Sequence, residues 1–256
     1  MFLALYGTDT VPPSVPAAKQ SKTLITRGDI KILEATENIR FLSQEIVKEY
    51  LFLFELSQKD EEKQKLNSLL VDLNNNLQII EKTTKDQDSK DILDFLAYSK
   101  DQMSQIFMEK LSKENAALLL DYSETLLEGA DSIAEAHMYA FSKEEKMLML
   151  TKKMEYLLER IMKYYIALHI GFDTPTNKTQ MQNAISKFHE NLHEILMYDY
   201  PQSIIATRSE LNQKWNTDHI YLSRSKHLFI PELMNMSTGY LEQLITQITL
   251  YHTKNL

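Results

Sequence analysis

The sequence predicts an all-α protein built as two tandem up-down four-helix bundles that share a long central helix. Helix breakers are scarce, with only 5 glycines and 6 prolines in 256 residues. Apolar side chains recur at alternating spacings of three and four, which is the period of bundle helices. The chain also matches itself at an offset of 115 residues, which indicates a duplicated helical unit.

The first half of the chain divides into four predicted helices. The first helix is predicted over about residues 27–57, where apolar residues fall at helical spacing: Ile32, Ala35, Ile39, Leu42, Ile46 and Leu53. A second helix is marked by the apolar series from Leu66 to Ile80, and residues 83–86 form the break after it. A third helix carries the apolar residues of 92–107, and the polar turn at 112–115 opens a fourth.

That fourth helix shows no obvious end before residue 170. Residues 116–170 contain no proline and only one glycine, Gly129, so we expect one helix or two nearly collinear ones. At 1.5 Å per residue such an element spans roughly 80 Å. Gly171 and Pro175 end it, and three further helices are predicted over 177–198, 202–225 and 231–254.

The internal repeat explains this plan. Residues 31–53 align with residues 146–168 with identities at Lys31, Leu33, Thr36, Leu42, Ile46, Lys48, Tyr50 and Leu53. The same offset carries Asn76 onto Asn191 and Leu126 onto Leu241. We therefore divide the chain into a tail over 1–27, a first module over 28–140 and a second module over 141–256.

Composition and motifs argue against several classes of function. The net charge of −8 without a basic cluster disfavours nucleic acid as a partner. The absence of cysteine rules out disulfides and thiolate zinc sites. No glycine-rich phosphate loop and no G-x-S-x-G elbow occurs. We expect a non-enzyme with no catalytic residues and no cofactor.

The segment His189-Glu190-Asn191-Leu192-His193 spells H-E-x-x-H, the spacing of a zinc peptidase. A catalytic zinc site needs a third ligand, and Glu210, the nearest candidate, lies in an unrelated context. The repeat counterparts of this segment are polar residues without metal chemistry: Asn74, Asn75 and Gln78. We interpret the histidines as the polar edge of a bundle helix and expect no metal.

One segment of the first helix resembles a known family. IRFLSQEIVKEYL, residues 39–51, is similar to the R-M-L-S-Q-R-x-A-K-x-Y segment of the type IV pilus methyl-accepting chemotaxis transducer N-terminal domain, the PilJ/NarX-like sensor family. The matching positions are Arg40, Leu42, Ser43, Gln44, Lys48 and Tyr50. The resemblance covers about residues 28–256 and implies two tandem modules of that family.

The resemblance implies an extracytoplasmic input domain that binds a small ligand such as nitrate, often at a dimer interface, with Arg40 pairing with the anion. The residues themselves fit this role, because Arg40, Gln44 and Lys48 lie at i, i+4 and i+8 with Ser43 alongside. Two cations, an amide and a hydroxyl form a reasonable cradle for a planar oxyanion. The alternative is that these four residues are solvated flanks that cover the apolar seam.

The sequence departs from the family at neighbouring positions. Glu37-Asn38 replaces a glycine-arginine pair, and Glu45 replaces a second arginine. In the second module the stripe becomes Glu155, Glu159 and Lys163, whose charge would repel an anion, so we expect any anion site to lie in the first module.

We therefore expect a stand-alone sensory or ligand-binding module in the periplasm. It would bind a small anion such as nitrate or nitrite and signal through a membrane-bound protein, with a homodimer as the family's usual assembly. The alternative is a non-catalytic structural or adaptor protein that binds another protein through its helical surfaces. The apolar start MFLALYG is either a flexible tail or the remnant of an export signal, and without such a signal upstream the location would be cytoplasmic.

Overall fold

The computed structural model describes residues 26–55, 60–223 and 229–256, and these residues contain helices and no strand. The all-α prediction is confirmed. The eight helices are α1 (Arg27–Phe52), α2 (Asp60–Thr83), α3 (Gln87–Met108), α4 (Lys113–Ala136), α5 (Lys143–His169), α6 (Pro175–Met197), α7 (Gln202–Ser223) and α8 (Pro231–Lys254). Their bounds repeat at the offset of 115 residues, most closely between α3 and α7.

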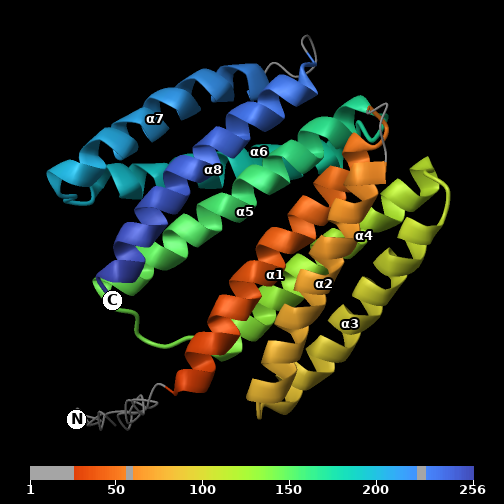
Figure 1. Cartoon of the computed structure of the whole chain (residues 1–256), viewed down its shortest axis with the longest axis horizontal. Helices are drawn as coiled ribbons and strands as arrows, with labels where there is room; N and C mark the ends of the chain where they lie inside the picture. The colour runs from red at the N-terminus through yellow and green to blue at the C-terminus, as the bar shows by residue number, and fades with distance from the viewer. Residues whose placement is uncertain (1–25, 56–59, 224–228) are drawn as a thin grey trace, which may run out of the picture.

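The helices pack in two groups of four that meet through α1 and α5. In the first group, α1 packs against α2 and α4, and α3 closes the group between them. In the second group, α5 packs against α6 and α8, and α7 lies between those two. Figure 1 shows α1 and α5 side by side and running in the same direction. Each half of the repeat therefore contributes its first helix to the contact between the groups.

The prediction of one long helix over 116–170 is wrong. α4 ends at Ala136, α5 begins at Lys143, and α5 runs back alongside α1 instead of continuing α4 (Figure 1). A capping box starts α5: the Ser142 hydroxyl accepts from Glu145 N at 3.1 Å, and Glu145 Oε2 accepts from Ser142 N at 2.7 Å. Tyr139 also donates to Glu145 at 2.6 Å, which ties the connection to the new helix.

The other helix ends follow the sequence closely. α1 ends at Phe52 with a turn over 53–55, earlier than the predicted residue 57, which lies outside the described residues. The predicted end of the seventh helix at residue 225 and the N-terminal segment 1–25 lie outside them as well. Gly171 has a φ of 115°, a conformation that favours glycine, and Phe172 N donates to Ala167 O at 2.9 Å, so the stop after α5 is confirmed.

A histidine near the end of its last helix closes each group. His137 Nδ1 lies 3.1 Å from the Asp29 carboxylate on α1, and His252 Nδ1 lies 2.7 Å from the Glu144 carboxylate on α5. The offset of 115 carries the first pair onto the second. The other ring nitrogen of His252 lies 2.8 Å from the Tyr200 hydroxyl, which precedes α7. In the first half, the other ring nitrogen of His137 lies 3.3 Å from the Ser89 hydroxyl on α3, so a histidine joins the same three places in both halves.

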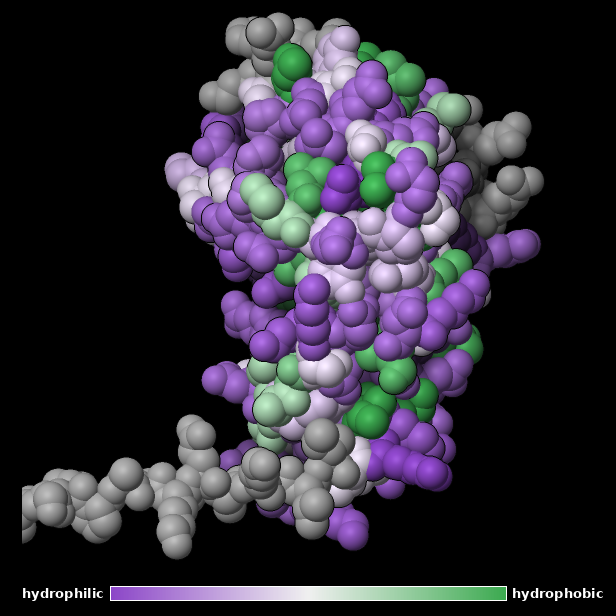
Figure 2. Space-filling view, turned by 90° about the vertical axis from the view of Figure 1, so that its left-hand side faces the viewer, coloured by the Kyte–Doolittle hydropathy of each residue, from purple (hydrophilic) through white to green (hydrophobic). Residues whose placement is uncertain are grey.

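The surface and interior fit a helical bundle of this size. The face in Figure 2 is mostly hydrophilic, and its apolar side chains gather in small separate clusters. Among the described residues, no helix combines the length and the apolar character that a membrane crossing needs. The interior is not purely apolar, because charged side chains of α1 and α5 are buried where the groups meet.

Candidate functional site: a buried polar network between α1, α4 and α5

The four residues of the predicted cradle lie on α1, but the structure does not gather them around one open site. Ser43, Gln44 and Lys48 are buried, and only Arg40 reaches an edge of the molecule. Arg40 and Gln44 contact residues of α4, whereas Lys48 contacts α5. The predicted stripe is thus divided between two neighbouring helices.

Arg40 is paired with two carboxylates. Its Nε lies 2.6 Å from Asp131 Oδ1 on α4, and its Nη1 contacts Glu37 one turn earlier on α1. The two acids differ in environment, since the Glu37 side chain is 5% exposed and that of Asp131 is 54% exposed. Burial raises the pKa of Glu37 above its usual range despite the attraction of Arg40. Asp131 is therefore the partner that solvent or a solute can most easily replace.

Two residues of α5 complete the surroundings of Arg40. The charge of the exposed Lys153 acts to lower the pKa of the Glu37 carboxyl, although burial outweighs it and raises that pKa. The Tyr156 phenol is 6% exposed, and burial together with the charge of Asp131 raises its pKa to about 12. The Arg40 edge thus contains two cations, two carboxylates and one neutral phenol.

Ser43 and Gln44 belong to a hydrogen-bond chain inside the molecule. The Ser43 hydroxyl donates to Arg40 O at 2.7 Å and accepts from Gln44 Nε2 at 2.9 Å. Gln44 Nε2 also reaches Ser123 O on α4 at 3.4 Å. Lys163 Nζ on α5 then donates to the Ser123 hydroxyl at 2.8 Å, so this serine links α1 and α5 through α4.

Lys163 is completely buried and shares an acid with Arg160. Glu124 Oε1 accepts from Lys163 Nζ at 2.7 Å, and Glu124 Oε2 accepts from Arg160 Nη2 at 2.6 Å. Burial of Glu124 acts to raise the pKa of its carboxyl, but the two cations outweigh burial and lower it to about 2. Burial lowers the pKa of Lys163 to about 8, more than Glu124 raises it.

Lys48 joins the two groups through a second set of carboxylates. Its Nζ lies 2.8 Å from Glu159 Oε2 on α5 and 3.1 Å from Glu49 Oε1. Burial acts to lower the pKa of Lys48, but these carboxylates raise it well above its ordinary value. Glu49 also pairs with Lys65 of α2 at 2.8 Å, so the network continues to the surface.

The two halves make related contacts across the α1–α5 pair. By the offset of 115, Glu159 corresponds to Gln44 and Lys163 corresponds to Lys48. One contact is the direct ion pair between Lys48 and Glu159, and its counterpart is the Lys163 and Gln44 pair bridged by Ser123. The offset of 115 therefore relates the contacts between α1 and α5 as well as the sequences of the two halves.

In the second half, nearby lysines compensate the glutamates that were expected to repel an anion. Glu155 pairs with Lys152 at 2.8 Å, and Glu159 pairs with Lys48. The histidines of the H-E-x-x-H segment, His189 and His193, are exposed on α6, as expected for a solvated helix edge. Within the described part of the chain, no three histidine, aspartate or glutamate side chains are grouped to hold a metal ion.

Sequence reasoning missed the partners of the predicted residues: Asp131, Glu124, Lys153 and Tyr156. They lie on α4 and α5. Their positions depend on the turn over 137–142, where the sequence analysis predicted a continuous helix instead. A signal was present, since Ser142 and Glu145 have the S-x-x-E spacing of a capping box.

Three comparisons bear on the identity of the chain. No protein-family model matches it, no curated protein matches it, and no solved structure matches it significantly. The likeness of residues 39–51 to the PilJ/NarX-like sensors therefore stays a prediction.

Proposed function

We propose that the chain is a non-catalytic sensory module that binds a small anion such as nitrate or nitrite at the Arg40 edge. One observation carries the proposal: Arg40, to which the resemblance assigns the anion, holds an exposed carboxylate, Asp131, that a small anion would replace. A planar oxyanion can accept from the guanidinium in the same way as Asp131 does. Binding is then an exchange of one anion for another.

The surroundings of Arg40 favour such an exchange. Lys153 of α5 adds a second positive charge, and Tyr156 supplies a hydroxyl that stays protonated because its pKa is about 12. Because these two residues lie on α5 and Arg40 lies on α1, an anion here would contact both groups of helices. We infer that occupancy shifts α1 relative to α5, and that this shift is the signal.

The wider proposal follows the resemblance. Residues 28–140 and 141–256 would be two tandem modules, located in the periplasm, whose state is read by a membrane-bound signalling protein. The contact of α1 with α5 supports this proposal, because it joins the first helices of the two repeats in parallel. A homodimer of the chain is a further proposal that size-exclusion chromatography with light scattering would test.

A thermal-shift and calorimetric titration with nitrate and nitrite tests the anion site. We expect saturable stabilisation of the wild-type protein and none of Arg40→Ala. Asp131→Asn should bind the anion at least tenfold more tightly, because the competing carboxylate is gone. Affinity should also rise at lower pH, since protonation of Glu37, whose pKa burial raises, leaves the charge of Arg40 less compensated.

Glu128→Gln is the matched control, because Glu128 is an exposed acid on the same helix as Asp131. It should leave the affinity unchanged. If wild type and Asp131→Asn both fail to respond to the anion panel, the anion proposal is wrong, and the structural or adaptor alternative becomes the better hypothesis.

A further inference from the structure

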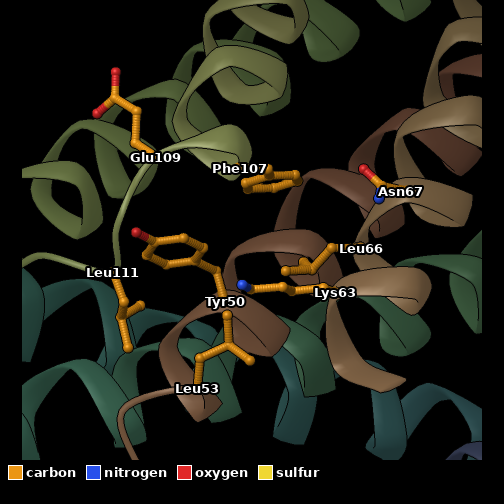
Figure 3. Close-up of a pocket in the computed structure, with 8 residues that line it drawn as sticks. All are labelled: Tyr50, Leu53, Lys63, Leu66, Asn67, Phe107, Glu109 and Leu111. Atoms are coloured by element: carbon orange, nitrogen blue, oxygen red, sulfur yellow. The ribbon is translucent and has the colours of Figure 1, made fainter. Parts of the chain in front are cut away.

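The pocket at the end of the first group is lined by aromatic side chains that already stack on each other. The rings of Tyr50 and Phe107 are nearly parallel, with 5.8 Å between their centroids, and Figure 3 shows both among the residues that line the pocket. In the second group, Phe229 stacks on Tyr165 with 5.3 Å between centroids. These aromatic side chains thus find partners inside the chain, whereas apolar side chains on the outer face of α8 stay exposed.

The outer face of α8 carries a stripe of exposed, uncharged side chains, which we call the α8 stripe. Its members recur at alternating spacings of three and four, so they lie along the side of the helix opposite the buried Ile245. Figure 1 shows α8 at the outside of the second group, and Leu233 and Met236 are 60% and 75% exposed. This spacing is that of a seam between two packed helices. The stripe consists of Leu233, Met236, Tyr240, Gln243, Gln247 and Leu250.

The corresponding face of α4 is acidic. The offset of 115 carries Met236, Gln243 and Leu250 of the stripe onto exposed carboxylates of α4, and only Leu118 is apolar on both helices. Two copies of the α4 face would repel each other, whereas two copies of the α8 stripe would not. The acidic counterparts are Asp121, Glu128 and Glu135.

The α8 stripe is complementary to itself when two copies run antiparallel. Its spacings read the same in both directions, so a two-fold axis between positions 240 and 243 brings all members of both copies into register. The leucines at the two ends then meet, and the amides of one copy meet the less apolar centre of the other. The facing pairs are Leu233 with Leu250, Met236 with Gln247, and Tyr240 with Gln243.

The charges at the ends of α8 also favour the antiparallel direction. Glu232 in the first turn and Lys254 at the last residue are the exposed charged side chains of this helix. An antiparallel pair places each Glu232 beside the Lys254 of the other copy, whereas a parallel pair would place like charges together. Beside the stripe, Glu210 of α7 is engaged by the Tyr240 hydroxyl, which donates to it.

We propose that the α8 stripe is the interface with a second copy of this chain, with the two α8 helices antiparallel around a two-fold axis. The proposal assigns an interface to the homodimer proposed above and rests on it, but it does not depend on the Arg40 anion site. That site lies on α1 and α4, so anion binding and dimer formation are measured separately.

Sedimentation velocity of the wild-type chain over a range of concentrations measures the dimer. Because each copy contributes only six side chains of one helix, the contact is smaller than a standard interface, and we expect a Kd on the order of 10 µM. A chain that stays monomeric at about 200 µM, well above that Kd, would overturn both the homodimer and this interface.

Leu233→Glu and Leu118→Glu form a matched pair, because the offset of 115 relates these two exposed leucines. Leu233→Glu should weaken the dimer at least tenfold, since the two-fold axis buries the added charge twice against apolar side chains. Leu118→Glu should leave the Kd unchanged, and circular dichroism checks that both variants fold. Equal weakening by the two variants, or a dimer that Leu233→Glu leaves intact, would reject the α8 stripe while keeping the homodimer.

Charge reversal tests the antiparallel direction. Glu232→Lys should weaken the dimer about threefold, because two cations then face each other at each end of the seam. Adding Lys254→Glu should restore the wild-type Kd, since the pair is reversed but again of opposite sign. A double variant that binds no better than Glu232→Lys alone would show that the two α8 helices are not antiparallel.

Discussion

At the residue scale, two carboxyl groups meet in the interior beside Lys48. Burial of Glu242 on α8 and the nearby charge of Glu159 raise the pKa of Glu242 to about 9. The Lys48 ammonium acts in the opposite direction but does not outweigh them. At neutral pH, Glu242 therefore keeps a proton in the folded protein that it loses in the unfolded chain.

Glu242→Gln should stabilise the protein at and above neutral pH. Because the folded pKa of Glu242 is raised, the folded state binds the extra proton between about pH 4.5 and 9, so this group makes stability fall as pH rises through that window. Glutamine mimics the protonated acid and should raise the free energy of unfolding by about 1–3 kcal/mol at pH 7. Urea denaturation at several pH values measures the effect.

Glu194→Gln on α6 is the control for this prediction, because Glu194 is exposed. It should change neither the stability nor its pH dependence. The assignment to Glu242 would be contradicted if Glu242→Gln kept the wild-type decline of stability between neutral and alkaline pH.

At the scale of elements, two helix-interior glycines have opposite surroundings. A Cβ on Gly129 of α4 would stand 2.5 Å from Leu96 Cδ2 and 3.2 Å from Ile92 Cγ2 on α3. A Cβ on Gly239 of α8 would meet nothing within 4 Å. The first glycine allows α3 and α4 to approach closely, whereas the second only lowers the helix propensity of α8.

Alanine at these two positions should shift stability in opposite directions. Gly129→Ala should cost about 1–3 kcal/mol, because Leu96 is buried and cannot move aside without disturbing the core. Gly239→Ala should add about 0.5–1 kcal/mol, since alanine is the better helix former. Thermal and urea denaturation of the two variants measures both changes, and a stabilised Gly129→Ala would show that α3 and α4 are less tightly packed than described.

The element scale also shows where the sequence was sufficient. The predicted start of α7 and both bounds of α8 coincide with the structure, and Pro201 and Pro231 mark the two starts. The turn between α4 and α5 was missed because it contains neither proline nor glycine, and only the capping box of Ser142 and Glu145 marks the new helix. A helix cap is marked only by side chains that hydrogen-bond to the backbone. This is a weaker sequence signal than a proline, whose backbone lacks the N–H donor.

At the scale of the whole molecule, the ion pair of Lys48 with Glu159 joins the two groups in their shared interior. Both side chains are less than 10% exposed, so each depends on the other for compensation of its charge. The sequence predicted Lys48 as part of a cradle on one face of a helix. It could not supply Glu159 as the partner, because that contact depends on α5 folding back beside α1.

A double-mutant cycle tests the ion pair of Lys48 with Glu159. Lys48→Met should lower the free energy of unfolding by about 3–5 kcal/mol, because it leaves Glu159 buried without its cation. Adding Glu159→Leu should recover part of that loss, and the two changes should not be additive. Additive effects would indicate that the two groups are held together by apolar contacts alone.

The parallel contact of α1 with α5 joins two similar helices that can differ in sequence. In a homodimer, symmetry makes every substitution appear twice, so an interface contact between equivalent helices is always made by identical pairs of residues. Here a covalent link joins the two halves, so Lys48 meets a glutamate on one side while Lys163 meets a serine-bridged glutamine on the other. Each half can therefore acquire its own contacts without altering the other half.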